Sequence, residues 1–274
     1  MKVLITGSGG QLGQALPEAL STHELITLRH SELDVTRFSE VREAVAEHRP
    51  ELVINAAAYT NVDGAETEWE WAYRVNAGGP GNLAVVTAKH RIPLLTISSD
   101  YVFDGLAGRP YHEFDRTNPL SVYGKSKLAG EETVASLNPR HYIVRTAWLY
   151  HTSGKNFPRT MLAQADQQSV RVVNDQHGSP TYAPHLARAI SALIETGAYG
   201  TYHLAGSGAT SWYELTKRLY QLMGIKTNVI PVSTSEFSRP AQRPPFSVLT
   251  TIQNPEILLP HWEEGLAEFA RNIS

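Results

Sequence analysis

Cysteine is absent from this chain of 274 residues. Its absence excludes disulfides, thiolate zinc sites and any cysteine nucleophile or acid/base. No apolar run approaches the roughly 20 residues that a helix needs to cross a bilayer. The stretch Met1–Gly7 has neither a long apolar region nor a small-residue cleavage site. We therefore expect a cytoplasmic protein with no membrane partner.

Excess charge of one sign is also lacking. The 24 basic and 27 acidic residues give a formal net charge of -3, so nothing suggests nucleic acid or an acidic membrane surface as a partner. Hydrophobic residues make up 42% of the chain and charged residues 19%, values that argue against disorder. At roughly 150 residues per domain, the length suggests one large or two small domains.

Short apolar runs alternate with longer helical patterns through the first half of the chain. The predicted strands are Lys2–Thr6, Glu24–Leu28, Leu52–Asn55, Pro93–Ser98 and His141–Arg145. The predicted helices between them are Gln11–Ser21, Phe38–His48, Glu66–His90 and Ser121–Ser136. Strands separated by helices indicate βαβ units, and continuously apolar strands indicate a sheet covered on both faces. We predict an α/β fold with a Rossmann-type, doubly wound parallel sheet.

The pattern loosens after about residue 150. Strands are predicted at Arg171–Asn174 and Thr201–Ala205, helices at His185–Thr196, Trp212–Met223 and Pro255–Ile273, and a proline-rich extended loop at Ser233–Phe246. No flexible hinge separates the two halves. We therefore predict a dinucleotide-binding domain over residues 1–150, with a contribution from about 171–198. A smaller, interleaved substrate-binding lobe is predicted over 151–274.

A glycine series follows the first strand and opens the first helix. Gly7 permits a tight turn, Gly10 lets the backbone approach a pyrophosphate, and Gly13 lets helix and strand pack closely. The free N–H groups at the helix start, at Gln11 and Leu12, then face the phosphates. The alternative is a glycine-rich β–α turn without a ligand.

The end of the second strand bears on the choice of cofactor. An acidic residue there would hold the ribose 2′-hydroxyl of NAD, but this chain has Arg29, which suits the 2′-phosphate of NADPH. A solvated surface arginine is the alternative. Asp34 and Val35 are predicted at the adenine end of the cofactor. The small residues Ala56, Ala57 and Ala58 leave room for it at the next strand end.

Tyr123 and Lys127 are four residues apart at the start of a predicted helix, so they share one face. A tyrosine hydroxyl is protonated at neutral pH and can donate to a carbonyl oxygen that receives a hydride. An ammonium nearby stabilises the phenolate that remains. Ser98 and Ser99 end the preceding strand, where Ser99 can bond the same carbonyl and Ser98 can meet the cofactor. The alternative for Tyr123 and Lys127 is a surface lysine beside a half-buried tyrosine.

These motifs and others resemble the extended short-chain dehydrogenase/reductases over essentially the whole chain, and within them the reductases of dTDP-4-keto sugars. The segments that carry the resemblance are Gly10–Gly13, Asn55–Glu66, Ser98–Gly105, Pro119–Glu131, Arg145–Tyr150, Asp175–Thr181 and Arg239–Pro244.

The resemblance implies reduction of the C4 ketone of dTDP-6-deoxy-L-lyxo-4-hexulose by NADPH or NADH, giving dTDP-L-rhamnose. It makes Tyr123 the proton donor, Lys127 its partner and Ser99 the carbonyl-orienting hydroxyl. It also puts Thr60, Val62 and Trp148 on the substrate side. Some relatives bind Mg²⁺ between the subunits of a homodimer, but no carboxylate cluster in this sequence can be assigned to a metal.

Aromatic and basic side chains complete the predicted substrate site. The Trp148 indole could pack on a sugar face, although a core tryptophan is as good an interpretation. Arg239 and Arg243 flank a proline-rich loop and could bind the two phosphates of a nucleotide sugar. A structural role, with the guanidinium groups bonding backbone carbonyls, is equally open.

Two other functions stay compatible with the sequence. One is a nucleotide-sugar epimerase or dehydratase that keeps NAD bound. The other is a non-catalytic subunit like the regulatory β subunit of methionine adenosyltransferase.

Pro80 lies inside the helix predicted over Glu66–His90, so we expect a kink that frees the Asn76 carbonyl. That carbonyl could then accept from a water that contacts Lys127, or the kink could merely let the helix follow the sheet.

Overall fold

The computed structural model describes residues 1–273 and contains a six-stranded, all-parallel sheet. The strand order is β10-β5-β4-β3-β1-β2. The bounds are β1 (Lys2–Thr6), β2 (Glu24–Leu28), β3 (Leu52–Asn55), β4 (Leu94–Ser99), β5 (His141–Thr146) and β10 (Gly200–His203). The predicted doubly wound parallel sheet is confirmed.

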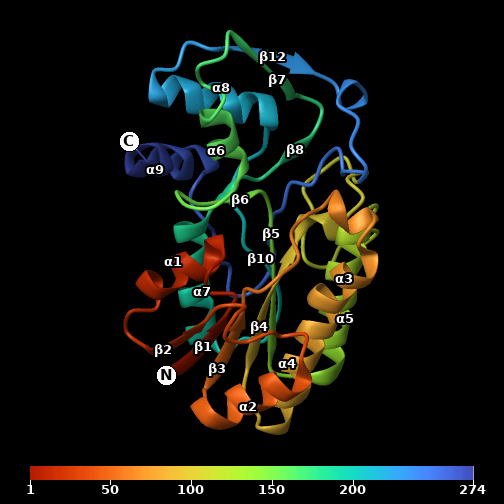
Figure 1. Ribbon diagram of the computed structural model, residues 1–274, viewed down its shortest axis with the longest axis vertical. Helices are drawn as coiled ribbons and strands as arrows, with labels where there is room; N and C mark the ends of the chain where they lie inside the picture. Colours follow the sequence, from red (N-terminus) through yellow and green to blue (C-terminus); the bar gives the residue numbers. More distant parts are fainter. Residues whose placement is uncertain (274) are drawn as a thin grey trace.

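Helices cover both faces of this sheet, because successive strand residues point to opposite sides (Figure 1). Val3 and Ile5 belong to a core shared with α1 (Gln11–Ala19) and α7 (Ala183–Thr196). Leu4, between them, belongs to a second core on the other side. The helices of that side are α2 (Phe38–His48), α4 (Gly79–Lys89) and α5 (Val122–Leu137).

The single helix predicted over Glu66–His90 is wrong, because the chain there is divided. A 3-10 turn (Gly64–Glu66) and α3 (Trp69–Tyr73) are followed by a π turn (Arg74–Gly78) before α4 begins. The Gly79 N–H bonds the Arg74 carbonyl, five residues back. Pro80 then occupies the first turn of α4, where its missing N–H costs nothing. The predicted disturbance at Pro80 therefore takes the form of a π turn on its N-terminal side.

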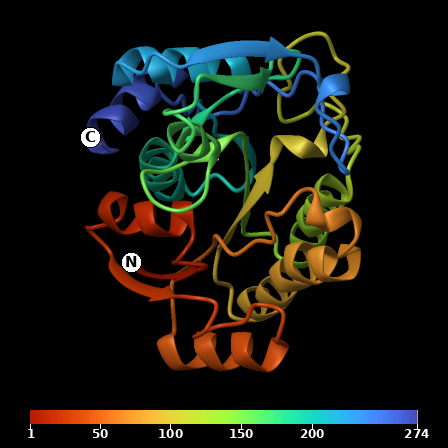
Figure 2. The same cartoon turned by 45° about the horizontal axis from the view of Figure 1, so that its top comes forward.

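A second lobe sits over the carboxyl ends of the central strands (Figure 2). Its strand pairs are β7 (Ser169–Val173) with β12 (Asn228–Val232), β6 (Leu149–Tyr150) with β9 (Thr181–Tyr182), and β8 (His177–Gly178) with β11 (Thr210–Ser211). Its helices are α6 (Phe157–Leu162), α8 (Trp212–Met223) and α9 (Trp262–Ile273). The chain returns to the first lobe through α7 and β10, and then passes back to the second.

Two details of the predicted second half are wrong. The strand near 171 falls inside the stretch assigned to the first lobe, yet β7 pairs with β12. The last helix begins at Trp262 and not at Pro255, because the residues before it run across β10 as an irregular segment, in which the Gln253 amide donates to the Thr201 carbonyl. None of the helices in residues 1–273 is long and apolar enough to cross a membrane.

Candidate active site

The glycine series forms a tight cradle at the carboxyl end of β1. Gly7 has a φ of +68°, and a Cβ on it would lie 2.5 Å from the Ala57 nitrogen. A Cβ on Gly13 would lie 2.6 Å from the Ser8 Cα. Within residues 1–273 no side chain caps the start of α1, so its first N–H groups face the open end of the sheet. This cradle fits the pyrophosphate of a dinucleotide.

The backbone of Ala56 and Ala57 is held in place by a polar chain that links three strand ends. The Thr6 hydroxyl donates to the Asn55 amide oxygen at 2.7 Å, and the Asn55 amide nitrogen donates to the Thr96 hydroxyl at 3.2 Å. The same Asn55 oxygen accepts from the Ala57 N–H. Asn55 is thus a positioning residue, and its signals in the sequence were its place at a strand end and at the start of a segment that carried the resemblance.

Arg29, Asp34 and Val35, predicted to meet the adenosine half of the cofactor, differ in their surroundings. The Arg29 stem runs along the glycine loop, with its Cγ 4.0 Å from where a Gly9 Cβ would lie. The Asp34 carboxylate instead accepts from the N–H and hydroxyl of Thr36. Burial would raise the pKa of Asp34, but these bonds hold it below its usual value. Val35 is buried against Gly79, so it shapes the wall behind the loop.

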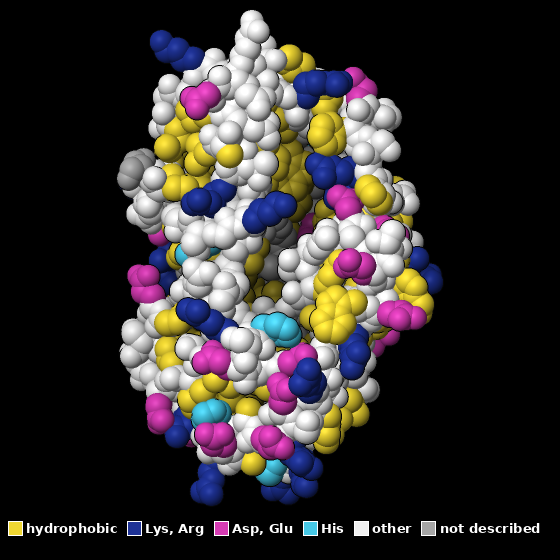
Figure 3. Space-filling view, in the orientation of Figure 1, with side chains coloured by type: hydrophobic (Ala, Val, Ile, Leu, Met, Phe, Trp, Pro, Cys, Tyr) yellow, Lys and Arg dark blue, Asp and Glu magenta, His cyan; other side chains and the backbone are white. Residues whose placement is uncertain are grey.

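The second lobe contacts the first at Gln11, where the glycine loop passes into α1. The Asn156 side-chain amide donates to the Gln11 amide oxygen at 3.1 Å. The space between the lobes is visible as a hollow in the surface, with Lys and Arg side chains along its upper rim (Figure 3). Gln11 is one of the predicted cofactor residues, and the second lobe contacts it directly. A bound dinucleotide would therefore contact both lobes.

Tyr123 and Lys127 lie on the first turns of α5, which begins where Ser121 caps the Gly124 N–H at 3.1 Å. Burial raises the pKa of Tyr123 to about 12, although the Ser99 hydroxyl opposes this. Burial lowers the pKa of Lys127 to about 8, against the attraction of Glu131. The Lys127 ammonium donates to the Ile97 carbonyl at 2.6 Å. The structure therefore brings the protonated phenol, the ammonium and the strand-end serine together.

Ser99 is oriented by the residue that follows it. Its hydroxyl donates to the Asp100 carboxylate at 3.0 Å and accepts from the Tyr101 N–H at 3.2 Å. The Ser247 hydroxyl donates to the other Asp100 oxygen at 2.5 Å. Burial raises the pKa of Asp100 to about 6, while both serine hydroxyls oppose the shift. Asp100 adjoins a predicted catalytic residue in the sequence, and that adjacency was the signal available for it.

The Ser98 hydroxyl does not face the hollow. It donates to the buried carboxylate of Glu131, one turn beyond Lys127. The Arg145 guanidinium clasps the same carboxylate, at 3.0 Å through Nε and 2.7 Å through Nη2. Ser98 thus ties β4 to α5 through its side chain, and its predicted contact with a cofactor is left to its backbone.

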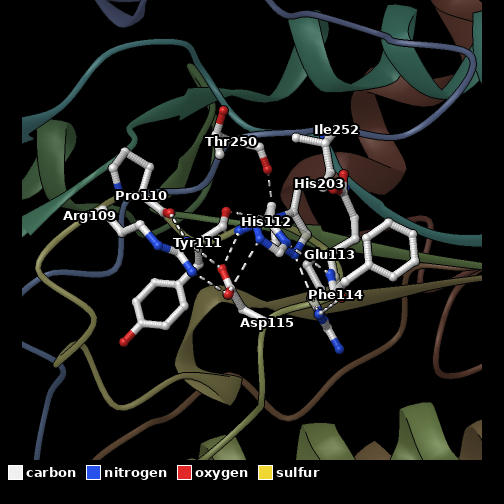
Figure 4. Close-up of polar contacts among 11 residues, drawn as sticks. Arg109, Pro110, Tyr111, His112, Glu113, Phe114, Asp115, His203, Thr250 and Ile252 are labelled. Carbon is white, nitrogen blue, oxygen red and sulfur yellow. Dashed lines mark hydrogen bonds and ion pairs between the residues drawn. The ribbon is translucent and has the colours of Figure 1, made fainter.

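A second buried carboxylate, that of Glu113, adjoins this network, because Arg145 also donates to the Glu113 backbone carbonyl at 3.3 Å (Figure 4). Glu113 accepts from the His203 N–H at 2.9 Å and from the Ile252 N–H at 3.1 Å. Burial lowers the pKa of His203 to about 4, so its ring is neutral at pH 7. The ring Nδ1 lies 2.9 Å from the Thr250 carbonyl oxygen. These bonds tie β10 to the 250–252 segment and to Glu113.

The Trp148 indole is clamped by the second lobe. Its backbone has a φ of +47°, an unusual value for a non-glycine residue. The ring stacks on Trp212 with centroids 3.4 Å apart and planes 5° from parallel. A Cβ on Gly178 would lie 2.5 Å from the Trp148 Nε1. The face that stacks on Trp212 is not free for a sugar, whereas Thr60 is exposed and Val62 half-buried in the segment after β3.

Arg239 and Arg243 both contact Asp63 in this structure. Arg243 forms two bonds with the carboxylate, at 3.0 and 2.9 Å, and Arg239 approaches it at 3.4 Å. Asp63 lies in a segment that carried the family resemblance, but a partner 180 positions away leaves no mark in the sequence. No group of three acidic or histidine residues suited to a metal occurs within residues 1–273.

A cradle for a dinucleotide and a buried tyrosine beside a lysine and a serine are arranged for proton transfer to a carbonyl that receives a hydride. The family model described as RmlD substrate binding domain matches residues 1–274. The chain belongs to this family.

Individual relatives of this RmlD-family chain match it over nearly its whole length. A dTDP-4-dehydrorhamnose reductase of Streptomyces griseus is 41% identical, covering 97% of this chain and 91% of its own. The crystal structure of a dTDP-4-dehydrorhamnose reductase from Clostridium acetobutylicum is 42% identical, with a TM-score of 0.97, and covers 100% and 99% of the two chains. The Bacillus anthracis dTDP-4-dehydrorhamnose reductase in complex with NADP is also 42% identical, with a TM-score of 0.96 and 99% coverage of both chains.

Proposed function

We propose that this protein uses NADPH to reduce the C4 ketone of dTDP-6-deoxy-L-lyxo-4-hexulose, giving dTDP-L-rhamnose. The observation that carries the proposal is the meeting of Tyr123, Ser99 and Lys127 beside the glycine cradle. Relatives about 40% identical over most of their length bear the name of this activity, and one was solved with NADP.

NADPH, when bound, supplies a hydride to C4, and the protein supplies the proton. Tyr123 is protonated at neutral pH because burial raises its pKa to about 12, so it donates to the C4 oxygen. The Ser99 hydroxyl, which here donates to Asp100, would turn its one hydrogen toward that oxygen to orient it. The Lys127 ammonium stabilises the phenolate left on Tyr123. The product is the alcohol, and the phenolate regains its proton from solvent.

The cofactor is assigned to the cradle and the strand ends around it. Gly7, Gly10 and Gly13, with the N–H groups of Gln11 and Leu12, would receive the pyrophosphate. Val35 and Ala56 to Ala58 would border the nucleoside and nicotinamide halves. Arg29, whose stem lies along the loop, would meet the 2′-phosphate of NADPH.

On the substrate side, Thr60, Val62 and Trp148 would border the sugar, and the arginines of the 239–243 segment would serve the diphosphate. Trp148 would offer an edge or its remaining face, since Trp212 covers the other. We also propose a homodimer located in the cytoplasm, which sedimentation of the purified protein and cell fractionation would test.

A direct assay tests the proposed function. The purified protein is mixed with NADPH and the dTDP-4-keto sugar, and the nicotinamide absorbance is followed while the product is identified by mass spectrometry. Stoichiometric loss of NADPH with gain of two hydrogens in the sugar supports the proposal. An isomerised sugar with no net loss of NADPH would indicate an epimerase, and no turnover would indicate a non-catalytic subunit.

A further inference from the structure

The segment Arg239–Ser247, called here the arginine segment, passes from the second lobe onto the first. The His177 N–H donates to the Pro245 carbonyl at 2.8 Å, which fixes the segment to β8. At its end, the Ser247 hydroxyl reaches Asp100 beside the catalytic serine. Gly105, with a φ of +80°, packs against it so closely that a Cβ would lie 2.8 Å from the Pro244 Cβ.

The beginning of the arginine segment is held by one side chain. The Asp63 carboxylate accepts two bonds from the Arg243 guanidinium and a third, at 3.2 Å, from the Ala241 N–H. A paired fork of this kind fixes orientation as well as distance. Asp63 follows β3 in the first lobe, so its bonds hold the segment across the gap between the lobes.

The two arginines that share this carboxylate are not equivalent. Arg243 is 16% exposed, donates to the Ala241 carbonyl at 2.8 Å as well as to Asp63, and lies near Tyr101, so its guanidinium is enclosed by partners. Arg239 is 51% exposed, approaches Asp63 only at 3.4 Å, and lies with its guanidinium over the Phe237 ring. Two cations against one carboxylate leave one positive charge uncompensated, and the exposed member carries it.

The uncompensated charge of Arg239 lies next to a cavity. A cavity of about 360 Å³ is bordered by Arg239 and Arg243 together with Gln176 and Thr234. Tyr101, which lies near Arg243, also touches the Tyr123 ring edge-on with centroids 5.7 Å apart. The Arg243 part of the arginine segment is therefore separated from the proposed proton donor by one aromatic ring.

We propose that Asp63 is a positioning residue that divides the work of the two arginines. Arg243, locked to Asp63, holds the arginine segment over the site, while Arg239 recognises the diphosphate of the nucleotide sugar. This inference rests on the proposed function for the identity of the nucleotide. It assigns Arg239 as the group that distinguishes a diphosphate from a monophosphate.

The test measures binding and local dynamics instead of turnover. The dissociation constants of dTDP and dTMP are measured by calorimetry on NADPH-loaded protein, and hydrogen exchange is followed in a peptide that spans the arginine segment. Arg239→Gln should reduce the preference for dTDP over dTMP about tenfold, the loss of one charge-assisted bond, and leave exchange unchanged. Arg171→Gln is the matched control, since Arg171 is 55% exposed and pairs with Glu236 at 3.0 Å in the same lobe.

Asp63→Asn and Arg243→Gln should give a different result. Both should accelerate exchange in the arginine segment several-fold, and because that segment carries Arg239, the dTDP preference should fall together with the faster exchange. Unchanged exchange in Asp63→Asn would overturn the positioning role, and a full dTDP preference in Arg239→Gln would overturn the recognition role. If the keto sugar is not reduced but these binding and exchange results hold, the proposed function fails while the division of roles stands for another nucleoside diphosphate.

Discussion

Gly13, on the first helix, packs directly on the backbone of Ser8, so closely that a Cβ on Gly13 would lie 2.6 Å from the Ser8 Cα. Backbone atoms cannot yield as a flexible side chain would, and the loop must move if this position gains a methyl group. The shape of the phosphate cradle is thus set by the approach of these two residues.

Gly13→Ala should weaken NADPH binding at least tenfold and lower the melting temperature by several degrees, the usual result of overpacking. Gly9→Ala is the control, because a Cβ there meets nothing closer than the Arg29 Cγ at 4.0 Å. Fluorescence titration with NADPH and thermal unfolding of both variants measure the difference. Equal binding by the two variants would remove the steric argument.

Much of this architecture could be predicted from the sequence, because the buried apolar residues recur with the period of a helix or form the short runs of a buried strand. The five strands predicted in the first half lie within one residue of their predicted bounds, since short, continuously apolar runs such as Leu52–Ile54 are typical of buried strands. The π turn before Pro80 was not foreseen as such, because a proline indicates a disturbance and not its form. The short strands β8 and β11 carry too few residues for any pattern.

Only part of the site could be predicted from the sequence, because tertiary contacts decide where each side chain points. Ser98 and Ser99 are neighbours at one strand end, and alternation sends one hydroxyl to Glu131 and the other to Asp100. Asp63 and Arg243 meet across 180 positions. The Asn76 carbonyl, expected near a water, packs against Gly130, and its side chain bonds Tyr59 and Ser126. Its predicted relay to Lys127 stays a prediction.

Arg29→Asp should shift cofactor preference from NADPH toward NADH by at least tenfold in the ratio of kcat/KM values. The substituted carboxylate would repel the 2′-phosphate and could bond the 2′-hydroxyl instead. Steady-state kinetics with both cofactors measure the ratio, and Arg42→Asp, the same charge change at an exposed position of α2, is the control. A ratio that stays the same would make Arg29 a surface charge only.

The rate of reduction should fall as pH rises through about 8. Burial lowers the pKa of Lys127 to about 8, so below that pH the ammonium is present and above it the charge that stabilises the Tyr123 phenolate is lost. A profile of kcat/KM from pH 6 to 10, with circular dichroism at each pH to monitor folding, measures this limb. A flat profile up to pH 10 in folded protein would contradict the role given to Lys127.

Gly178→Ala should raise the KM for the nucleotide sugar about tenfold and leave the KM for NADPH unchanged. The added methyl would lie 2.5 Å from the Trp148 Nε1, so the indole must leave its stack on Trp212, and small displacements of positioning groups are costly. The loss of the stacked pair can be followed by its coupled signal in circular dichroism. A disrupted stack with an unchanged sugar KM would remove Trp148 from the substrate site.

The central claim is that Tyr123 gives the proton while the nicotinamide gives the hydride. The decisive measurement uses NADPH deuterated at the transferred position, with wild type and Tyr123→Phe compared by mass spectrometry of the sugar. We predict one deuterium at C4 of the wild-type product, and a rate about a thousandfold lower in Tyr123→Phe with NADPH binding intact. Wild-type product without deuterium at C4, or turnover by Tyr123→Phe within a few-fold of wild type, would contradict the account.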